Sequence, residues 1–118
     1  VFKGGIVSYS NKVKENNLEI SRDKLKKYGA VSKEVSEEMC RKVSKILDVD
    51  ISISCTGISG PSGGSKNKPV GLVFISVKYQ DSIYTKKNNF LGDRENHRNL
   101  TANYALNMLR LILSEKWT

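Results

Sequence analysis

The sequence has few of the residues from which metal sites and disulfide frameworks are built. Its 118 residues include only two cysteines, Cys40 and Cys55, and one histidine, His97. Three such ligands cannot complete a tetrahedral zinc site, and a chain of this size needs no oxidised cross-link to fold. We therefore predict no metal site and a reducing compartment, with both cysteines in the core rather than reactive.

Long apolar runs are also missing. No stretch approaches the roughly 18 apolar residues that a membrane-spanning helix needs, and the first residues, VFKGGIVSYS, lack the pattern of a signal peptide. With 2 prolines, 9 glycines and 38% apolar residues, the composition is neither collagen-like nor disordered. We expect one compact, soluble, cytoplasmic domain with no membrane partner. Because Val1 leads almost directly into a strand-like segment, we expect the chain to begin inside a domain.

Negative charge is scarce relative to positive charge. Lys and Arg number 20 against 12 Asp and Glu, which gives a net charge of +8. A basic excess can mark a nucleic-acid-binding surface. Here, however, 15 of the 20 positive residues are lysines spread from Lys3 to Lys116 and interleaved with acids. A solvated lysine-rich surface is the favoured interpretation, and we do not expect nucleic acid as a partner.

Helix signals fall in three parts of the chain. The polar stretch 12–28 suits short helical turns that end at Gly29, a typical helix C-terminal residue. Ser32 is placed to cap a helix that extends to about Leu47, and its apolar residues recur every three or four positions. The last helix is predicted from about Glu95 onwards.

Strand patterns occupy the remaining segments. Residues 4–9 and 50–56 are short and β-prone, 70–79 is almost continuously apolar, as in a central strand, and 83–91 is more polar, as near an edge. Only Gln80, Asp81 and Ser82 separate the last two, which predicts an antiparallel hairpin. The element order predicts an α/β layered fold with a mixed sheet, its faces covered by apolar helices.

The stretch from Thr56 to Ser65, TGISGPSGGS, is the most distinctive in the chain. It places four glycines in eight positions after a predicted strand. Glycine tolerates positive φ and lets a ligand approach the main chain, so backbone N–H groups can surround an anion. The stretch matches neither the P-loop nor G-x-G-x-x-G, and a strand follows it rather than a helix. A phosphate cradle and a flexible connecting loop both remain open.

A tyrosine and a lysine follow the first predicted strand. If burial lowers the pKa of Lys14, its amine can exchange protons together with the Tyr9 phenol or activate a serine hydroxyl. Among 15 lysines, an ordinary surface charge is the competing interpretation.

Arg94 and Arg98 lie four residues apart at the start of the last helix, after a plausible N-cap at Asp93. On one helix face they can present paired donors to a phosphate or carboxylate. An exposed helix start is the alternative, and we interpret His97 as a surface or structural residue.

Four segments spread along the chain form a specific series: GGIVSYSNKVK, YGAVSKEVSEEM, TGISGPSGGSKNKPVGLVFISV and FLGDRENHR. Together with the terminal helix they resemble the C-terminal domain of the competence/damage-inducible CinA proteins, over essentially the whole chain. The resemblance implies a three-layer α/β/α fold with a mixed sheet.

The same domain occurs alone as the bacterial nicotinamide mononucleotide deamidase. The resemblance therefore implies an amidohydrolase that forms nicotinate mononucleotide and ammonia in pyridine-nucleotide salvage, through an acyl-enzyme and without a metal or organic cofactor. Tyr9 and Lys14 match residues that would assist proton transfer, and Arg94 and Arg98 match arginines that would hold the phosphate. The residues matching the substrate cradle are Thr56, Gly57, Gly60, Pro61, Gly63 and Gly64.

One part of the family pattern has no match. The family's domain opens with a strand and a helix that carry Glu-Ser-Cys-Thr-Gly-Gly, the source of the nucleophilic serine. The similar Ser54-Cys55-Thr56-Gly57 is followed by Ile58 and belongs to the later loop. We therefore expect residues 1–118 to form a single CinA-type domain that lacks this strand and helix, is inactive alone and leaves a sheet edge or apolar face exposed. An inactive nucleotide-binding module is the alternative function, nucleic-acid binding is a third, and a homo-oligomer is expected.

Overall fold

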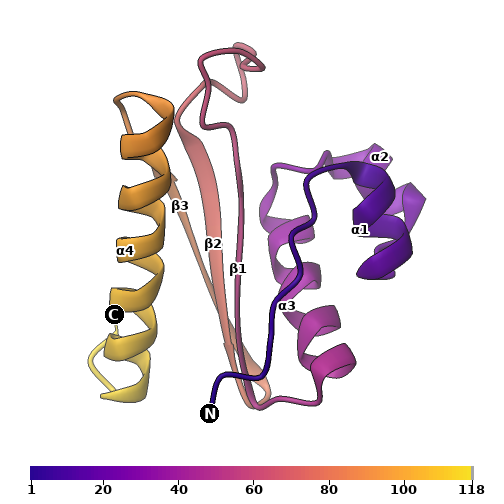
Figure 1. Cartoon of the computed structure of the whole chain (residues 1–118), viewed down its shortest axis with the longest axis vertical. Helices are drawn as coiled ribbons and strands as arrows, with labels where there is room; N and C mark the ends of the chain where they lie inside the picture. The colour runs from indigo at the N-terminus through magenta and orange to yellow at the C-terminus, as the bar shows by residue number, and fades with distance from the viewer. Residues whose placement is uncertain (118) are drawn as a thin grey trace.

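The computed structural model describes residues 1–117 and arranges them in three layers (Figure 1). A three-stranded sheet lies between α4 on one side and the other three helices on the other. The elements are α1 (Asn11–Asn17), α2 (Arg22–Tyr28), α3 (Lys33–Leu47), β1 (Ile51–Gly57), β2 (Leu72–Tyr79), β3 (Ser82–Asn89) and α4 (Arg94–Leu113). The predicted α/β/α layering is confirmed. Within residues 1–117, no helix combines the length and apolar character needed to cross a membrane.

The sheet is antiparallel throughout the described residues. Its strand order is β1-β2-β3, with Ile51 opposite Tyr79 in the first pairing and Tyr79 opposite Ser82 in the second. The predicted hairpin, the central position of β2 and the edge position of β3 are confirmed. The predicted mixed sheet is wrong for these three strands.

Residues 4–9 do not form the predicted strand. This segment is extended but joins no ladder, and the Ser8 carbonyl accepts a hydrogen bond from the Lys14 side chain instead. Two consecutive glycines open the segment, and glycine lowers strand propensity. Val7 and Tyr9 are 87% and 84% exposed, so burial of these side chains does not hold them in a sheet.

Local capping residues set the helix boundaries that the sequence predicted. Ser32 caps α3 by accepting a hydrogen bond from the Val35 N–H, and Asp93 caps α4 in the same way from Asn96. Gly29 ends α2 at a φ of 79°, where its N–H donates to the Leu25 carbonyl. These caps satisfy backbone groups that a helix end leaves unpaired.

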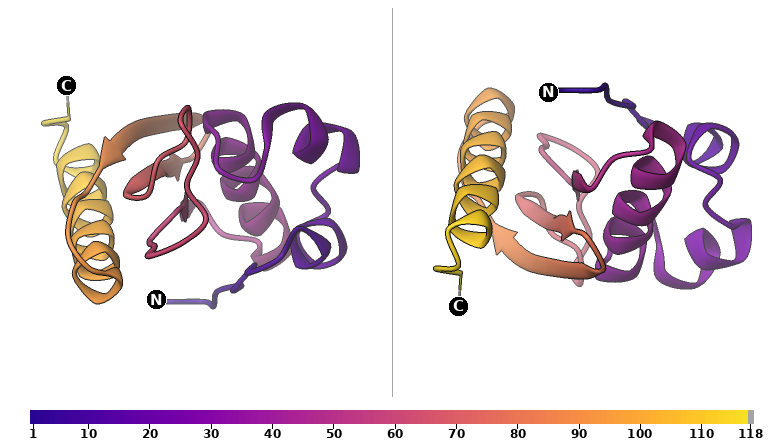
Figure 2. Two further views of the ribbon diagram at one scale, coloured as in Figure 1. Left: turned by 90° about the horizontal axis from the view of Figure 1, so that it is seen from above. Right: turned by 90° about the horizontal axis from the view of Figure 1, so that it is seen from below.

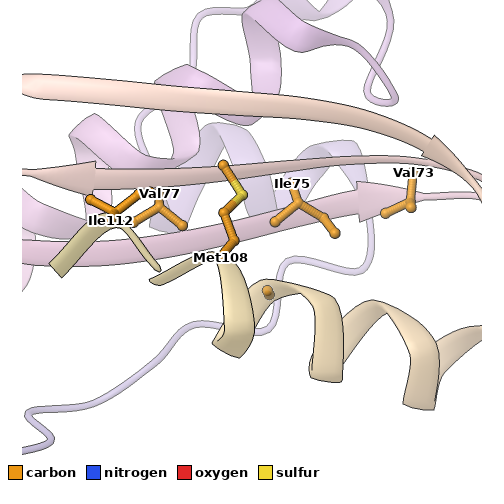
Figure 3. Packing of buried hydrophobic residues seen from close by; sticks show 6 residues of the cluster. Val73, Ile75, Val77, Met108 and Ile112 are labelled. Atoms are coloured by element: carbon orange, nitrogen blue, oxygen red, sulfur yellow. The ribbon is translucent and has the colours of Figure 1, made fainter. Parts of the chain in front are cut away.

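The main apolar core lies between β2 and α4 (Figure 3). Alternate residues of β2 point toward one face of α4, and their side chains interdigitate there. Burial of such aliphatic side chains is the principal favourable contribution to folding. The buried members are Val73, Ile75, Val77, Ala105, Met108 and Ile112.

The other face of the sheet is polar, and it contacts α3 through hydroxyl groups. The Ser36 hydroxyl lies 3.1 Å from that of Ser54 and 2.8 Å from that of Ser76, which in turn lies 2.8 Å from Thr85 Oγ1. The expectation that an apolar face of this helix covers the sheet is therefore wrong. Its apolar residues pack instead against α1 and α2, in a second core of Leu18, Ile20, Leu25, Val35 and Met39.

Candidate functional site

A cleft of about 1410 Å³ opens between the N-terminal segment, residues 1–9, and α4. It runs along β1, whose outer edge pairs with no strand among residues 1–117, and Ile51, Leu106 and Leu113 leave apolar surface exposed there. The predicted open sheet edge is thus present. Pockets for small ligands usually measure about 300–1,000 Å³, so this cleft is larger than one small ligand requires. The predicted site residues that line it are Tyr9, Lys14, Thr56, Gly57, Gly60, Gly63 and Arg94.

Lys14 is a buried lysine on the wall of this cleft. It is 5% exposed and its ammonium donates a hydrogen bond of 2.5 Å to the carbonyl of Ser8. Helix α1, which Ser10 caps, carries Lys14 in its second turn and directs it inward. Desolvation lowers the pKa of Lys14, because burial disfavours the charged form. The surface-charge interpretation of this residue is wrong.

Tyr9 also lines the cleft, but unlike Lys14 it is exposed to solvent. It ends the N-terminal segment and is 84% exposed. The structure thus brings Tyr9 and Lys14 to one cleft, with the phenol in water and the amine in the protein interior.

Thr56 and Gly57 form the end of β1 where the cleft meets the sheet. Thr56 is buried, and its hydroxyl donates to the Ala30 carbonyl at 2.8 Å, so its oxygen is fixed in place. A Cβ on Gly57 would lie 2.7 Å from the Leu72 carbonyl oxygen, and only glycine fits this position without displacing β2. The backbone of β1 therefore approaches β2 more closely here than a side chain would allow.

The connection between β1 and β2, residues 58–71 and hereafter the glycine loop, crosses one end of the sheet (Figure 2). The Gly71 N–H donates to the Ile58 carbonyl and pairs the two ends of the loop, and the Ser65 N–H donates to the Lys68 carbonyl and closes a turn within it. The Lys68 side chain also donates to the Tyr28 carbonyl at 2.6 Å. These bonds favour an ordered loop over a flexible connection.

The glycine loop places only some of its predicted residues in the cleft. Gly60 and Gly63 line it at φ values of 80° and 98°, where side chains are disfavoured. Pro61 is exposed and Gly64 packs against the backbone of Val70, and neither is among the lining residues.

The two arginines of α4 are separated by the fold. Arg94 lines the cleft, and its guanidinium donates to the Gly60 carbonyl at 3.2 Å. Arg98 is exposed and is not part of the cleft wall. The paired-donor arrangement predicted from the i,i+4 spacing therefore does not face this cleft.

Sequence reasoning missed a serine and histidine that meet beside the site. Ser59, which lines the cleft, lies 2.8 Å from Nδ1 of the buried His97, and Nε2 of the same ring lies 2.9 Å from the Gly71 carbonyl. The structural interpretation of His97 is confirmed and the surface one is wrong. The two residues are 38 positions apart, and no local pattern indicates that they meet.

The two cysteines differ in environment. Cys40 is buried in the hydroxyl-rich interface with α3, as predicted, whereas Cys55 is exposed rather than in the core. Surrounding protein atoms still desolvate the Cys55 sulfur although the residue is partly open to solvent, and this, with a smaller effect of Cys40, raises the pKa of Cys55 to about 11. The thiol is therefore protonated at neutral pH. In residues 1–117 no three His, Cys, Asp or Glu side chains are grouped to hold a metal ion.

A family model describing the CinA C-terminal domain matches residues 1–113. The chain belongs to the CinA C-terminal domain family. A CinA-like protein of Thermosipho melanesiensis is 49% identical over 116 residues, which are 97% of this chain and 29% of that protein. A CinA-like protein of Prochlorococcus marinus is 52% identical over 96% of this chain and 27% of its own length. The chain thus spans less than a third of these CinA relatives.

Solved CinA structures share the fold. The competence damage-inducible protein A of Klebsiella pneumoniae superposes with a TM-score of 0.87 at 30% identity, over 91% of this chain and 66% of that one. A CinA superfamily protein of Escherichia coli gives a TM-score of 0.85 at 32% identity, over 89% and 61% of the two chains. The arrangement of α3, the sheet and α4 is therefore that of the CinA superfamily.

Proposed function

We propose that this domain binds nicotinamide mononucleotide in the cleft and takes part in hydrolysis of its carboxamide to nicotinate mononucleotide and ammonia. The observation that carries the proposal is Lys14, a buried amine with a lowered pKa on the wall of a cleft. A neutral amine can accept the proton of an attacking hydroxyl and return it to the departing ammonia. Burial increases the neutral fraction of this amine relative to that of an exposed lysine.

The other lining groups suit the remaining parts of this substrate. The Arg94 guanidinium supplies charged donors for a phosphate, and the glycine loop offers main-chain N–H groups without shielding side chains. The exposed Tyr9 phenol can donate a hydrogen bond to the substrate from the open side. The nucleophile of the family resemblance is a serine of the Glu-Ser-Cys-Thr-Gly-Gly motif, and we assign none among residues 1–118.

The test is release of ammonia and nicotinate mononucleotide by the full-length gene product. We expect turnover by the wild type, a loss of more than about a hundredfold in Lys14→Met, and little change in Lys12→Met, which removes an exposed lysine of the same helix. A wild-type protein that binds the nucleotide without hydrolysing it would replace this proposal with the inactive nucleotide-binding module.

A further inference from the structure

His97 connects both ends of the glycine loop to α4. Its Nδ1 lies 2.8 Å from Ser59 Oγ at the start of the loop, and its Nε2 lies 2.9 Å from the carbonyl oxygen of Gly71 at the end. The residue is only 2% exposed. One imidazole ring therefore joins two loop stems that are 12 positions apart in the sequence.

The partners of the ring determine its tautomer. A carbonyl oxygen can only accept, so Nε2 must carry the proton in its bond to Gly71. In the neutral ring, Nδ1 is then an acceptor, and the Ser59 hydroxyl donates to it. Both ring nitrogens are used, and rotation of the ring would break both hydrogen bonds at a buried position.

Neighbouring groups hold the same ring and the same loop. The Phe90 ring packs edge-on against His97 at 6.2 Å between centroids, and Tyr104 packs against Phe90 at 5.8 Å. One turn before His97, Arg94 donates to the Gly60 carbonyl. The first turns of α4 thus contact the loop at Ser59, Gly60 and Gly71.

The held part of the loop is the part that faces the cleft. Gly60 and Gly63 line it at positive φ, a conformation that a free glycine-rich chain samples among many others. If the loop were unattached, its ordering would cost free energy at the moment of ligand binding. Hydrogen bonds formed in advance remove that cost.

We propose that His97 is the positioning residue of this site: through Ser59 and Gly71 it fixes the glycine loop in the conformation that receives the nucleotide. That the loop receives a nucleotide rests on the proposed function, whereas the attachment of the loop to His97 does not. His97 is assigned no contact with the substrate.

The test uses full-length protein and compares Ser59→Ala and His97→Gln with two controls. Thr101→Ala removes a buried hydrogen bond to the His97 carbonyl within α4 without touching the loop, and Ser59→Thr keeps the hydroxyl. Amide hydrogen exchange of residues 58–71 is measured without ligand, and kcat and KM are measured with nicotinamide mononucleotide.

We expect faster loop exchange in Ser59→Ala and His97→Gln, with kcat within about twofold of the wild type. KM should rise about three- to tenfold in Ser59→Ala, which loses one hydrogen bond, and at least as much in His97→Gln, because the imidazole makes both hydrogen bonds to the loop. Thr101→Ala should match the wild type in loop exchange and KM, and Ser59→Thr, which keeps the hydroxyl, should match it in loop exchange. Nitrogen chemical shifts of His97 should show the Nε2–H tautomer. Unchanged loop exchange in both test variants, faster exchange with unchanged KM, or the Nδ1–H tautomer would each overturn the proposal.

If the wild type neither binds nor hydrolyses the nucleotide, the proposed function fails. The exchange rates and the tautomer then still decide whether His97 holds the loop.

Discussion

The ammonium of Lys14 donates a hydrogen bond of 2.5 Å to the carbonyl of Ser8, and this bond joins α1 to the N-terminal segment. It places a charged group in a position that is 5% exposed. Burial of an ammonium group is unfavourable unless several hydrogen bonds compensate. A basic residue kept in such a place is more readily explained by chemistry than by stability.

The lowered pKa of Lys14 makes stability depend on pH. Because its folded-state pKa is below 10.5, the unfolded chain holds this proton more tightly than the folded chain does. The free energy of unfolding contributed by this group therefore rises with pH between the folded pKa and 10.5. We expect the stability of the wild type relative to Lys14→Met to increase as the pH rises toward 10.5, measured by urea denaturation. Parallel pH dependences of the two proteins would contradict the assignment.

Replacement of Arg94 should weaken binding of the phosphate more than binding of the nucleoside part of the substrate. In Arg94→Ala we expect KM for nicotinamide mononucleotide to rise about ten- to a hundredfold, since a hydrogen bond to a charged group is worth about 1.5–3 kcal/mol. Arg98→Ala is the matched control, because Arg98 lies outside the cleft. For the nucleoside without its phosphate, the effect of Arg94→Ala should be much smaller, since only the hydrogen bond from Arg94 to the Gly60 carbonyl is then lost. Equal effects of the two substitutions on the nucleotide would argue against this role for Arg94.

A methyl group at Gly57 should destabilise the sheet. In Gly57→Ala the new carbon would lie 2.7 Å from the Leu72 carbonyl oxygen and 2.8 Å from Val73 Cβ. We expect a loss of about 1–3 kcal/mol in the free energy of unfolding, the usual cost of an overpacked site. Gly5→Ala, where no atom lies within 4 Å, should change stability by less than about 0.5 kcal/mol. Urea denaturation of the two variants provides the measurement. Equal losses in the free energy of unfolding would show that a methyl group at Gly57 is accommodated without overpacking.

The hydroxyl network between α3 and the sheet should behave as a coupled unit. We expect Ser76→Ala to cost about 1–3 kcal/mol, because it removes a partner from both Ser36 and Thr85 at a fully buried position. In the double variant Ser36→Ala with Ser76→Ala, the loss should be smaller than the sum of the two single losses. Ser82→Ala, at the exposed first residue of β3, is the control. Strict additivity in thermal or urea denaturation would show that the hydroxyls act independently.

Helix ends and the hairpin could be predicted because their signals are local. Ser32, Asp93 and Gly29 act on backbone groups within four residues of themselves, so the sequence contains both partners of each interaction. The turn between β2 and β3 is equally local. Most of the fold follows from such features together with the apolar pattern of β2.

The sequence-based predictions that failed concern residues whose environment depends on contacts with residues far away in the chain. Lys14 lies in a polar stretch, and its burial depends on how α1 packs on the second core. The contact of α3 with the sheet uses serines, which an apolar periodicity does not mark. Similarly, the His97 and Ser59 contact exists only because α4 lies beside the glycine loop in three dimensions.

The serine-rich interface of α3 has a mechanical consequence for the cleft. Aliphatic surfaces tolerate small sliding motions, whereas directional hydroxyl pairs are lost when a helix shifts along its axis, leaving buried groups without partners. Helix α3 is therefore a stationary element. Ala30, just before it, receives the Thr56 hydroxyl, so the floor of the cleft is fixed to the same stationary element. We therefore expect motions that admit substrate or release product in the cleft walls outside this interface, such as the N-terminal segment or the outer part of the glycine loop.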